Sequence, residues 1–314
     1  MSSAARPATW VIVNPAAGAG QAERRWPALA DRLHAAGLAF TAAVTCRPGD
    51  ATWLARDAAA GGATTIAVVG GDGTVNEVVN GLLAAGADSV TRPALAILPA
   101  GTGADFARSR GIRSLDGAIA ALLHGQAQTI DLGHVTFRDE AGGEQTRFFA
   151  NVADCGLGPI VSQQIAGAPK GLGPAAYFYG ALRAIAGYRP VEVRVGVDDH
   201  IAYTGPSQLV AVANSAYFGG GMHIAPKASS ADGQFDIVIL GDVSRAALTT
   251  DLLPRVYRGA HLRHPAIHFA RGAAVTIETS APLPLETDGE IAGTAPARFT
   301  LLPGALRVLH PPEP

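Results

Sequence analysis

Hydrophobic and polar positions follow two different patterns along the chain. In the first part, short apolar runs such as Thr9–Pro15 and the stretch "TTIAVVG" are separated by segments in which apolar residues recur every three or four positions. Trp26, Leu29 and Leu33 lie on one face of such a segment. Apolar strands that alternate with amphipathic helices are typical of a parallel sheet covered by helices. The first part therefore predicts an α/β domain with a parallel sheet.

The pattern changes after about Gln126. Short runs with apolar residues at alternate positions follow one another, among them "VEVRVGV", "HIAYTG", "SQLVAVANS" and "AVTIET", and Gly, Pro, Asp or Asn separates them. Two helical stretches interrupt these runs, "AAYFYGALRAIAGY" and "RAALTTDLLPRVYRG". Many short alternating strands indicate an antiparallel domain. We therefore expect a β-sandwich or an open barrel in the second part.

The composition argues against several classes of protein. With 314 residues, the chain is long enough for two domains, and 48% hydrophobic residues can fill their cores. The net charge of -2 gives no electrostatic basis for binding nucleic acid. Cys46 and Cys155 are not spaced as zinc ligands or as a disulfide framework, and no apolar run is long enough to cross a membrane. We expect a soluble, cytoplasmic protein.

Four loops follow the expected strands of the α/β part, and each is suited to bind phosphate. They are Asn14–Gly20, the stretch after Thr45, Gly70–Thr74 and Pro99–Arg108. Glycine lets backbone N–H groups approach an anion, and open α/β sheets bind ligands at this edge. One such loop is equally well explained as a turn, whereas four together favour a nucleotide site. The motif GxxxxGK[ST] is absent, which disfavours a Walker-type NTPase. The motif GxGxxG followed by an acidic residue about twenty positions later is also absent, which disfavours a dinucleotide dehydrogenase.

Acidic residues accompany these loops and recur later in the chain. Asp72 and Asp105 are unusual beside phosphate, and a divalent cation between carboxylate and phosphate would explain them. In "PKASSADGQFD", Asp232 and the nearby carbonyl groups form either a metal loop or a simple β-turn.

The acidic stretch "ETDGE" has two readings as well. Glu286, Asp288 and Glu290 are either solvated hairpin charges or, beside a nucleotide, candidate general bases. On an extended strand, Asp288 and Glu290 would point to the same face, so their spacing does not separate their roles.

Five motifs together make the chain similar to a known family. "VNPAAGAG", "VVGGDGTVNEVVNGL", "LPAGTGADFAR", "GGGMHIAPKASSADGQFDIVIL" and "TDGE" occur in the order of the diacylglycerol kinase catalytic-domain family. This family includes bacterial soluble diacylglycerol and lipid kinases and the sphingosine and ceramide kinases. The resemblance implies an α/β nucleotide-binding domain like that of NAD kinases and phosphofructokinases, formed by residues 1–128 with 297–314 returning to it, and a β-sandwich lipid domain formed by 129–296. In the family, ATP and lipid meet between the two domains.

The resemblance also implies which residues form the sites. The nucleotide site would consist of Asn14, Pro15, Gly18, Thr45, Gly70, Gly71, Asp72, Gly73, Thr74, Val75, Asn76, Gly101 and Thr102. A Mg²⁺ site would consist of Ser229, Asp232 and Gln234, linked through water to Asp72 and Asp105. The catalytic base would be Glu290 or Asp288. One position departs from the family pattern, because Ala104 stands where the family has Asn.

The implied activity is that of an ATP-dependent lipid kinase, which phosphorylates a lipid hydroxyl. We expect the lipid to be diacylglycerol and the product to be phosphatidic acid. The expected partners are the lipid and a membrane surface contacted peripherally, with a homodimer left open and no nucleic acid. A kinase of small molecules related to NAD kinase is the first alternative. A non-catalytic nucleotide-binding regulator is the second, and Ala104 is the feature that favours it. The apolar segment Tyr177–Tyr188 would cover the β domain as a helix or border the path of the acyl chain.

Overall fold

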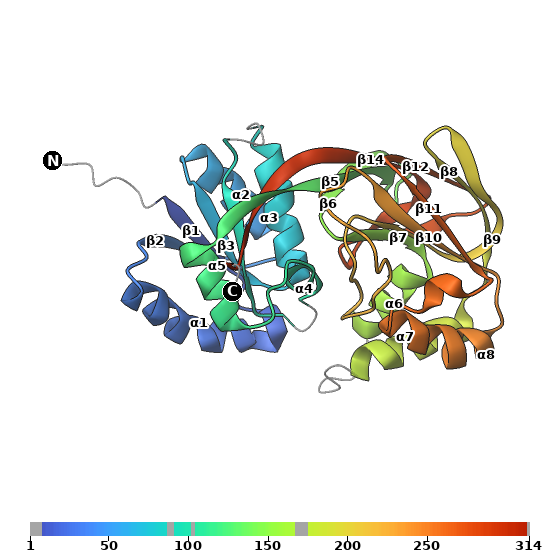
Figure 1. Cartoon of the computed structure of the whole chain (residues 1–314), viewed down its shortest axis with the longest axis horizontal. Helices are drawn as coiled ribbons and strands as arrows, with labels where there is room; N and C mark the ends of the chain where they lie inside the picture. Colours follow the sequence, from blue (N-terminus) through green and yellow to red (C-terminus); the bar gives the residue numbers. More distant parts are fainter. Residues whose placement is uncertain (1–7, 87–90, 102–103, 167–174, 313–314) are drawn as a thin grey trace. The chain divides into compact units, whose positions relative to one another are not determined.

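The computed structural model describes residues 8–86, 91–101, 104–166 and 175–312 (Figure 1). The chain divides into two compact units. Unit one contains residues 1–130 and 304–314, and unit two contains residues 131–303. Within the described residues, no helix combines the length and the apolar character needed to cross a membrane.

Unit one is built on a parallel sheet, as the alternation of apolar runs predicted. Its strands β1 (Thr9–Val13), β2 (Phe40–Val44), β3 (Thr65–Gly70) and β4 (Ala94–Pro99) pair in the order β4-β3-β1-β2. The end of β14 (Glu290–His310) adds a further parallel strand beside β4, where Val308 pairs with Leu95. β3 is buried over most of its length, which is typical of a parallel strand covered on both faces.

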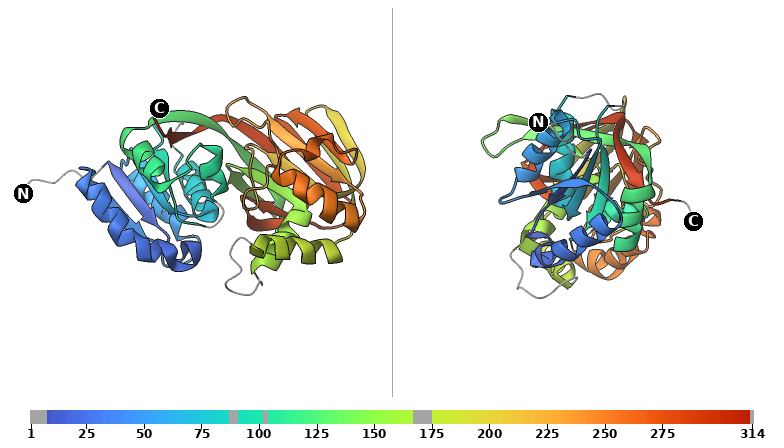
Figure 2. Two further views of the ribbon diagram at one scale, coloured as in Figure 1. Left: turned by 60° about the horizontal axis from the view of Figure 1, so that its bottom comes forward. Right: turned by 90° about the vertical axis from the view of Figure 1, so that its left-hand side faces the viewer.

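The strand order places helices on both faces of this sheet. The helices of unit one are α1 (Ala17–Ala35), α2 (Asp50–Ala60), α3 (Asp72–Ala84), α4 (Asp105–Ser109) and α5 (Leu115–His124). β2 and β3 lie on opposite sides of β1, so the direction of winding reverses there, and right-handed crossovers then put α1 and α2 on opposite faces. Arg32 of α1 forms an ion pair with Asp116 of α5, whereas α2 packs against α3 (Figure 2).

Close contact between α2 and α3 depends on one glycine. A Cβ atom on Gly81 would lie 2.2 Å from the carbonyl oxygen of Thr52, so the two helices approach within a distance that only glycine permits. Glu77 of α3 also accepts hydrogen bonds from the backbone N–H groups of Gly49 (2.9 Å) and Ala51 (3.1 Å) at the start of α2. These contacts hold α3, and the loop from which it begins, in a fixed position within unit one.

Unit two is β-rich and antiparallel, and its strands close into a ring. The strands are β5 (Gln126–Arg138), β6 (Glu144–Phe149), β7 (Val152–Gly156), β8 (Val191–Val197), β9 (His200–Ala213), β10 (Phe235–Gly241), β11 (Ile267–Gly272), β12 (Ala274–Thr279), β13 (Leu283–Thr287) and the first part of β14. The pairings run β8-β9-β7-β13-β14-β12 and return to β8. β10 and β11 extend from β9, and β6 pairs with β5.

This ring differs from the sandwich or open barrel that the sequence suggested. Two strands are long enough to pair with different partners along their length. β9, which we expected as two separate runs, pairs first with β8 and then with β7, and β14 pairs first with β13 and then with β12. These two strands close the ring because each connects sheet segments that shorter strands would leave apart.

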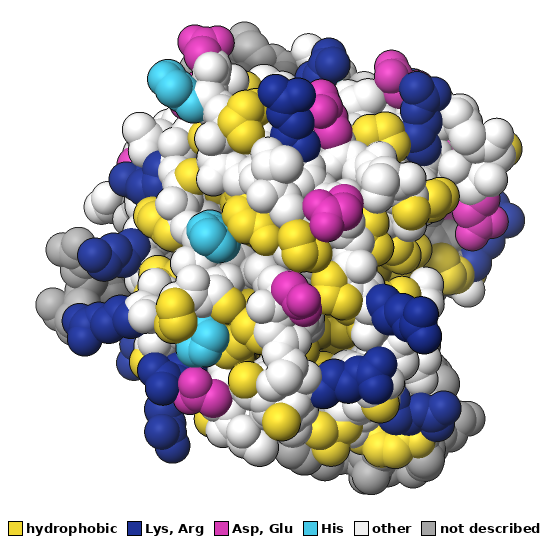
Figure 3. All heavy atoms as spheres, turned by 90° about the vertical axis from the view of Figure 1, so that its right-hand side faces the viewer, with side chains coloured by type: hydrophobic (Ala, Val, Ile, Leu, Met, Phe, Trp, Pro, Cys, Tyr) yellow, Lys and Arg dark blue, Asp and Glu magenta, His cyan; other side chains and the backbone are white. Residues whose placement is uncertain are grey.

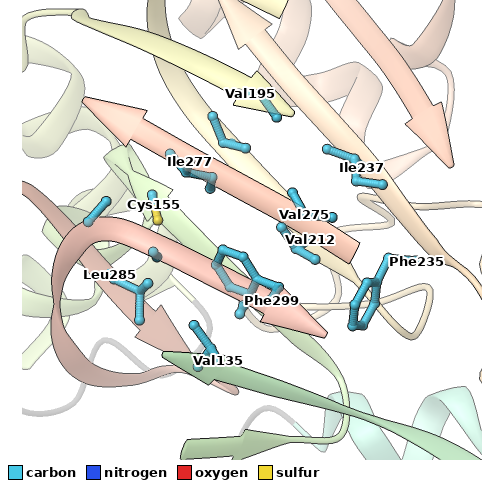
Figure 4. Packing of buried hydrophobic residues seen from close by; sticks show 14 of the residues in the cluster. Val135, Cys155, Val195, Val212, Phe235, Ile237, Val275, Ile277, Leu285 and Phe299 are labelled. Atoms are coloured by element: carbon cyan, nitrogen blue, oxygen red, sulfur yellow. The ribbon is translucent and has the colours of Figure 1, made fainter. Parts of the chain in front are cut away.

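The interior of the ring is filled by apolar side chains from every side (Figure 4). Phe149 stacks on Phe235 with ring centroids 5.7 Å apart and meets Phe299 edge-on at 6.2 Å. Cys155 and Leu285 also point into this core. Outside the ring lie α6 (Leu157–Ala166), α7 (Ala175–Gly187), α8 (Arg245–Ala247), a π-helical turn (Leu248–Leu252), α9 (Leu253–Tyr257) and a 3-10 turn (His261–Arg263). The prediction that the segment Tyr177–Tyr188 is helical agrees with α7.

Candidate functional site

The strand order of unit one reverses direction at β1, beside the carboxyl ends of β1 and β3. The chain leaves β1 in one direction and reaches β3 on its other side, and ligands of open α/β sheets bind at such a reversal. Asn14 follows β1 directly, and its backbone N–H donates to the carbonyl oxygen of Val69 in β3 at 2.9 Å. Its side-chain Nδ2 donates to Oγ1 of Thr74 at 2.9 Å. The loops after the two strands are therefore joined at the predicted position.

Glycines allow three of the loops to touch through their backbones. Gly18 has a φ of 61°, and a Cβ atom there would lie 2.3 Å from the carbonyl oxygen of Ala100. A Cβ atom on Gly101 would lie 2.7 Å from Cα of Gly71. A side chain at Gly18 or Gly101 would push the loops apart. The glycine-rich composition thus has a direct structural reason, and it leaves the backbone accessible to a ligand at the start of α3.

Asp72 connects the loop after β3 to the loop after β4. Its Oδ2 accepts the backbone N–H of Asp105 and its Oδ1 accepts that of Phe106, both at 3.0 Å. Burial raises the pKa of Asp72, while these hydrogen bonds and the charge of Arg108 act in the opposite direction. Asp105 is itself buried and forms an ion pair with Arg108. Both carboxylates therefore have partners within unit one.

The predicted nucleotide residues all belong to unit one, but their side chains differ in access. Thr102 lies outside the described residues, and Thr45, Thr74, Val75 and Asn76 are buried. Oγ1 of Thr74 accepts a hydrogen bond from Nδ2 of Asn14, which leaves the hydroxyl proton able to donate. Contacts to a nucleotide from this part of α3 would therefore come chiefly from the backbone.

Ala104 adopts a backbone conformation that explains why asparagine is common there in the family. Its φ is 51° and its ψ is 36°, which is the left-handed region. Alanine is strained in this region, whereas asparagine tolerates it better than most residues. The presence of alanine in place of asparagine at this position therefore strains the backbone at the start of α4.

The predicted metal loop lies on the surface of unit two. Ser229, Asp232 and Gln234 are exposed. One carboxylate oxygen of Asp232 forms an ion pair with Arg271, and the other accepts the backbone N–H of Gln234 at 3.2 Å. Asp131, which the sequence did not single out, accepts the backbone N–H of Gly233 at 2.9 Å and so supports the loop.

The oxygen atoms of this loop are ligands of the type that a hydrated Mg²⁺ ion binds. Carboxylate and carbonyl oxygens are the ligands that Mg²⁺ prefers, and it commonly retains several waters beside one or two carboxylates. Asp236 lies beside the loop, where its Oδ1 accepts from Nε of Arg271 at 2.7 Å and its Oδ2 is buried. Among the described residues, no three or more His, Cys, Asp or Glu side chains form a metal cluster. The loop therefore offers oxygen donors without a complete protein-built cage.

The two candidate bases lie in a tight turn, so the expectation of a shared strand face was wrong. Asp288 and Gly289 have φ values of 51° and 85°, and they join β13 to β14 where Thr287 pairs with Glu290. A two-residue turn with two positive φ values is the usual connection of a hairpin.

The turn gives these carboxylates different environments. The carboxylate of Asp288 accepts three backbone N–H groups, from Ala150 (2.9 Å), Asn151 (2.8 Å) and Val152 (3.1 Å). Glu290 is exposed. Asp288 is therefore held in one orientation, and Glu290 extends toward solvent.

An apolar cavity in unit two was not foreseen from the sequence. It has a volume of about 110 Å³ and lies among α6, α7, β9, β10 and the helical turns that follow β10. Leu157, Leu209, Leu248 and Val256 are among its apolar lining residues, and Glu286 is its acidic one. Ala181 and Ile185 of α7 also line it; α7 is the helix predicted either to cover the β domain or to border the path of an acyl chain.

Two family models match the chain. The diacylglycerol kinase catalytic domain matches residues 8–135, and the YegS C-terminal NAD kinase beta sandwich-like domain matches residues 151–310. The diacylglycerol kinase of Bacillus subtilis (strain 168) is 31% identical over 306 residues, which cover 96% of both chains. The diacylglycerol kinase of Staphylococcus epidermidis is 30% identical over 305 residues, which cover 96% of this chain and 92% of the relative.

Solved structures share the fold. The crystal structure of a diacylglycerol kinase from Bacillus anthracis str. Sterne superposes with a TM-score of 0.71 at 24% identity, and covers 99% of each chain. Yeast NADH kinase complexed with NADH superposes with a TM-score of 0.51 at 9% identity, over 96% of this chain and 83% of the other. Both likenesses concern the fold alone.

Proposed function

Because the chain belongs to the diacylglycerol kinase family and is a lipid kinase, we propose that it transfers the γ-phosphoryl group of ATP to the hydroxyl group of diacylglycerol and so produces phosphatidic acid. ATP is the phosphoryl donor that membership of a kinase family implies. The identity of the acceptor is our proposal. It is supported by the relatives named diacylglycerol kinase and by the apolar cavity of unit two.

The observation that carries the proposal is the contact among the glycine loops at the ends of β1, β3 and β4. The phosphates of ATP would lie against the backbone N–H groups of this region, near the N-terminus of α3. The absence of side chains at Gly18, Gly71 and Gly101 gives them access. Such preorganised donors stabilise the charge that develops on the transferred phosphoryl group. Arg108 would contribute a positive charge on the neighbouring helix α4.

A carboxylate of the turn after β13 would accept the proton of the lipid hydroxyl. As the proton moves to Asp288 or Glu290, the hydroxyl oxygen forms a bond to the γ-phosphorus and ADP leaves with the electrons of the broken P–O bond. The three N–H groups that bind Asp288 would keep its carboxylate in place during this step. Mg²⁺, which Asp232 with Ser229 and Gln234 would hold, would supply positive charge beside the phosphates when bound.

The acyl part of the acceptor would enter the apolar cavity of unit two. Apolar side chains dominate its lining, so burial of a hydrocarbon chain there removes apolar surface from water. The protein would meet such a substrate at a membrane surface. On the face drawn in Figure 3, apolar side chains are interspersed with basic and acidic ones, and scattered apolar surface of this kind does not identify a docking area.

The direct test is transfer of radiolabelled phosphate from ATP to lipids in detergent micelles, separated by thin-layer chromatography. Diacylglycerol, monoacylglycerol and long-chain bases should be compared in one panel, and NAD should be offered in a separate reaction. We expect Mg²⁺-dependent labelling of diacylglycerol and none of NAD. Labelling of NAD in place of any lipid would support the small-molecule kinase instead. Binding of ATP without labelling of any acceptor would support a regulatory protein.

A further inference from the structure

Arg110 of unit one is an arginine whose side chain is enclosed by the protein. It follows α4 directly as the C-cap residue, and it is only 9% exposed. Its guanidinium carbon lies 5.5 Å from the ring centroid of Phe106, which precedes it by one helical turn. The face of an aromatic ring attracts a cation but offers no ordinary hydrogen-bond acceptor, so the five N–H donors of the guanidinium group still require acceptors.

The described part of the chain does not supply these acceptors. Nε of Arg110 is fully buried and has no hydrogen-bond partner there. The acidic residues of the two nearest helices in sequence are engaged elsewhere, because Asp105 of α4 pairs with Arg108 and Asp116 of α5 pairs with Arg32. Among the described residues, no carboxylate forms an ion pair with Arg110. Its positive charge therefore has no partner of opposite sign within this region.

A second side chain with an unused ring nitrogen lies beside Arg110. His310 ends β14, and among the described residues its buried Nε2 has no hydrogen-bond partner. Burial, and then the charge of Arg110, lower the pKa of His310, so the two side chains lie near each other and the imidazole is neutral at pH 7. Gly125 permits this position, since a Cβ atom on it would lie 2.3 Å from the carbonyl oxygen of His310. A neutral imidazole that carries its proton on Nε2 donates one hydrogen bond.

An oxyanion would compensate for the burial of this unpaired charge. Burial lowers the pKa of Arg110 to about 10, so the guanidinium group stays positively charged at pH 7. A buried charge is unfavourable unless it has an opposite charge and hydrogen-bond partners. Phosphate supplies both, because two of its oxygens accept parallel hydrogen bonds from the edge of a guanidinium group. Since Arg110 is almost completely enclosed, a compact ion fits this position better than an extended ligand.

We propose that Arg110 and His310 form a binding site for a phosphate-type oxyanion in unit one, separate from the nucleotide loops. The guanidinium group would donate to two oxygens of the ion, and Nε2 of His310 would donate to a third. The glycine loops lie at the other end of α4, where Asp72 binds the backbone of Asp105. An ion bound at Arg110 would therefore stabilise from one end the helix that Asp72 holds at the other. The inference does not depend on the proposed function.

Inorganic phosphate is the direct probe, and it needs no variant. The melting temperature of the full chain should be measured at pH 7 in a phosphate-free buffer while phosphate is added, with chloride at the same ionic strength as the reference. An ion that binds the native state stabilises it, so phosphate should raise the melting temperature saturably and chloride should not. Glycerol 3-phosphate tests whether the site also takes a phosphate monoester or only the free ion. No stabilisation by either compound would overturn the proposal.

Two variants and a control assign the response to this site. Arg110→Met keeps the apolar stem, removes the charge and should weaken phosphate binding at least about tenfold. His310→Phe keeps a ring, removes one donor and should weaken binding about three- to tenfold, and it decides the matter if Arg110→Met does not fold. Arg113→Met is the matched control, because Arg113 is exposed and its loss changes the net charge equally. It should keep the wild-type affinity. An equal loss of affinity in the control, or none in the other two variants, would overturn the proposal.

Two further comparisons separate this site from a purely structural arginine and from the nucleotide site. In chloride alone, Arg110→Met should be at least as stable as the wild type, because it removes an unpaired buried charge. A variant that is less stable than the wild type by the same amount with and without phosphate would assign Arg110 a structural role and overturn the proposal. Phosphate should also stabilise wild-type protein that is saturated with Mg²⁺ and a non-hydrolysable ATP analogue. Loss of the phosphate effect under saturation would place Arg110 in the nucleotide site and overturn a separate one.

Discussion

The carboxylate of Asp72 accepts the backbone N–H of Phe106 at 3.0 Å and thereby fixes the start of α4 to the loop after β3. Because it also accepts the N–H of Asp105, one side chain satisfies two backbone donors at the end of a short helix. The aspartate of the glycine-rich motif is thus a structural link as well as a candidate for contact with a metal or nucleotide. Its two roles can be separated by experiment.

Asp72→Ala should abolish most phosphoryl transfer and lower stability by about 1 kcal/mol, which is the usual effect of removing a helix cap. Turnover and unfolding in urea would measure the two effects. Ser114→Ala is the matched control. Ser114 caps α5 by accepting the N–H of Gly117 at 3.0 Å, and it has no proposed part in the reaction. We expect it to lose similar stability and to keep its activity. Wild-type turnover in Asp72→Ala would contradict the proposed nucleotide site.

Replacement of Ala104 should make the protein more stable. With φ at 51°, alanine is strained, and the left-handed region costs an ordinary residue about 1–2 kcal/mol. Ala104→Asn and Ala104→Gly should therefore each raise the free energy of unfolding by up to about 1 kcal/mol. Ala28→Gly, at an exposed position within α1, should instead lower it by about 1 kcal/mol. Loss of stability in both Ala104 variants would contradict the assigned conformation.

The sequence could predict those features that depend on local chemistry. Gly18 and Gly101 are needed where backbones meet, so they mark the loops directly in the sequence. The order of the motifs identified the family, and the comparisons confirm it. The parallel sheet followed from the alternation of apolar runs with helices, which is also a local pattern.

Features that depend on pairing between distant segments could not be predicted. The ring closes because β14 pairs with both β13 and β12, and no pattern within β14 reveals its partners. Asp154 and Glu286 are opposed only because β7 pairs with β13. The one local signal was an aspartate within the otherwise apolar run "NVADCG", which a search for buried charges would have found. The sign of φ at Ala104 was also hidden, because alanine does not favour the left-handed region.

The two candidate bases should respond differently to amide substitution. General base assistance contributes about 10²–10⁴-fold to the rate, so the variant that removes the base should lose turnover by about this factor while its affinity for ATP changes little. Asp288→Asn should also lower the melting temperature, because an amide NH₂ group would face the N–H donors of residues 150–152. Glu290→Gln should lower the melting temperature much less than Asp288→Asn, since the side chain of Glu290 is exposed.

The melting temperature therefore serves as the control for this comparison. Some turnover in Asp288→Asn will be lost simply because part of the protein is unfolded. The loss is assigned to catalysis only if the fractional loss of turnover is much larger than the unfolded fraction at the assay temperature. Full phosphoryl transfer to diacylglycerol in both variants would show that the base lies elsewhere.

Asp232 should mediate any stabilisation by Mg²⁺. An ion that binds the native state raises stability by mass action, so Mg²⁺ should raise the melting temperature of the wild type and have little effect on Asp232→Ala. The variant also loses the ion pair with Arg271, and Arg271→Ala removes that pair while it keeps the carboxylate. Only Asp232→Ala should lose the response to Mg²⁺. An equal shift in all three proteins would identify the loop as a plain turn.

Stability should depend on pH through Asp154, and the sign follows from its pKa, which burial and then the charge of Glu286 raise. In the unfolded chain its carboxyl group loses its proton near pH 4, whereas in the native protein the proton is retained to a much higher pH. Between these values the native state binds more protons, so stability falls as the pH rises. Asp154→Asn lacks this effect and resembles the protonated acid in size and charge. The variant should therefore match the wild type near pH 4 and become progressively more stable than the wild type toward pH 8.

Asp139 provides a control of opposite sign for this pH dependence. Hydrogen bonds from the side chain of Gln145 and the backbone of Gly143 lower its pKa, so its contribution to stability is present above its unfolded pKa and is lost as the pH falls through its folded pKa. Asp139→Asn should accordingly lose stability at neutral pH and approach the wild type in acid. Unfolding in urea between pH 2 and pH 8 would measure all three proteins. If Asp154→Asn is destabilised equally at every pH, then the pKa of Asp154 is not raised in the native protein, and the predicted pH dependence is contradicted.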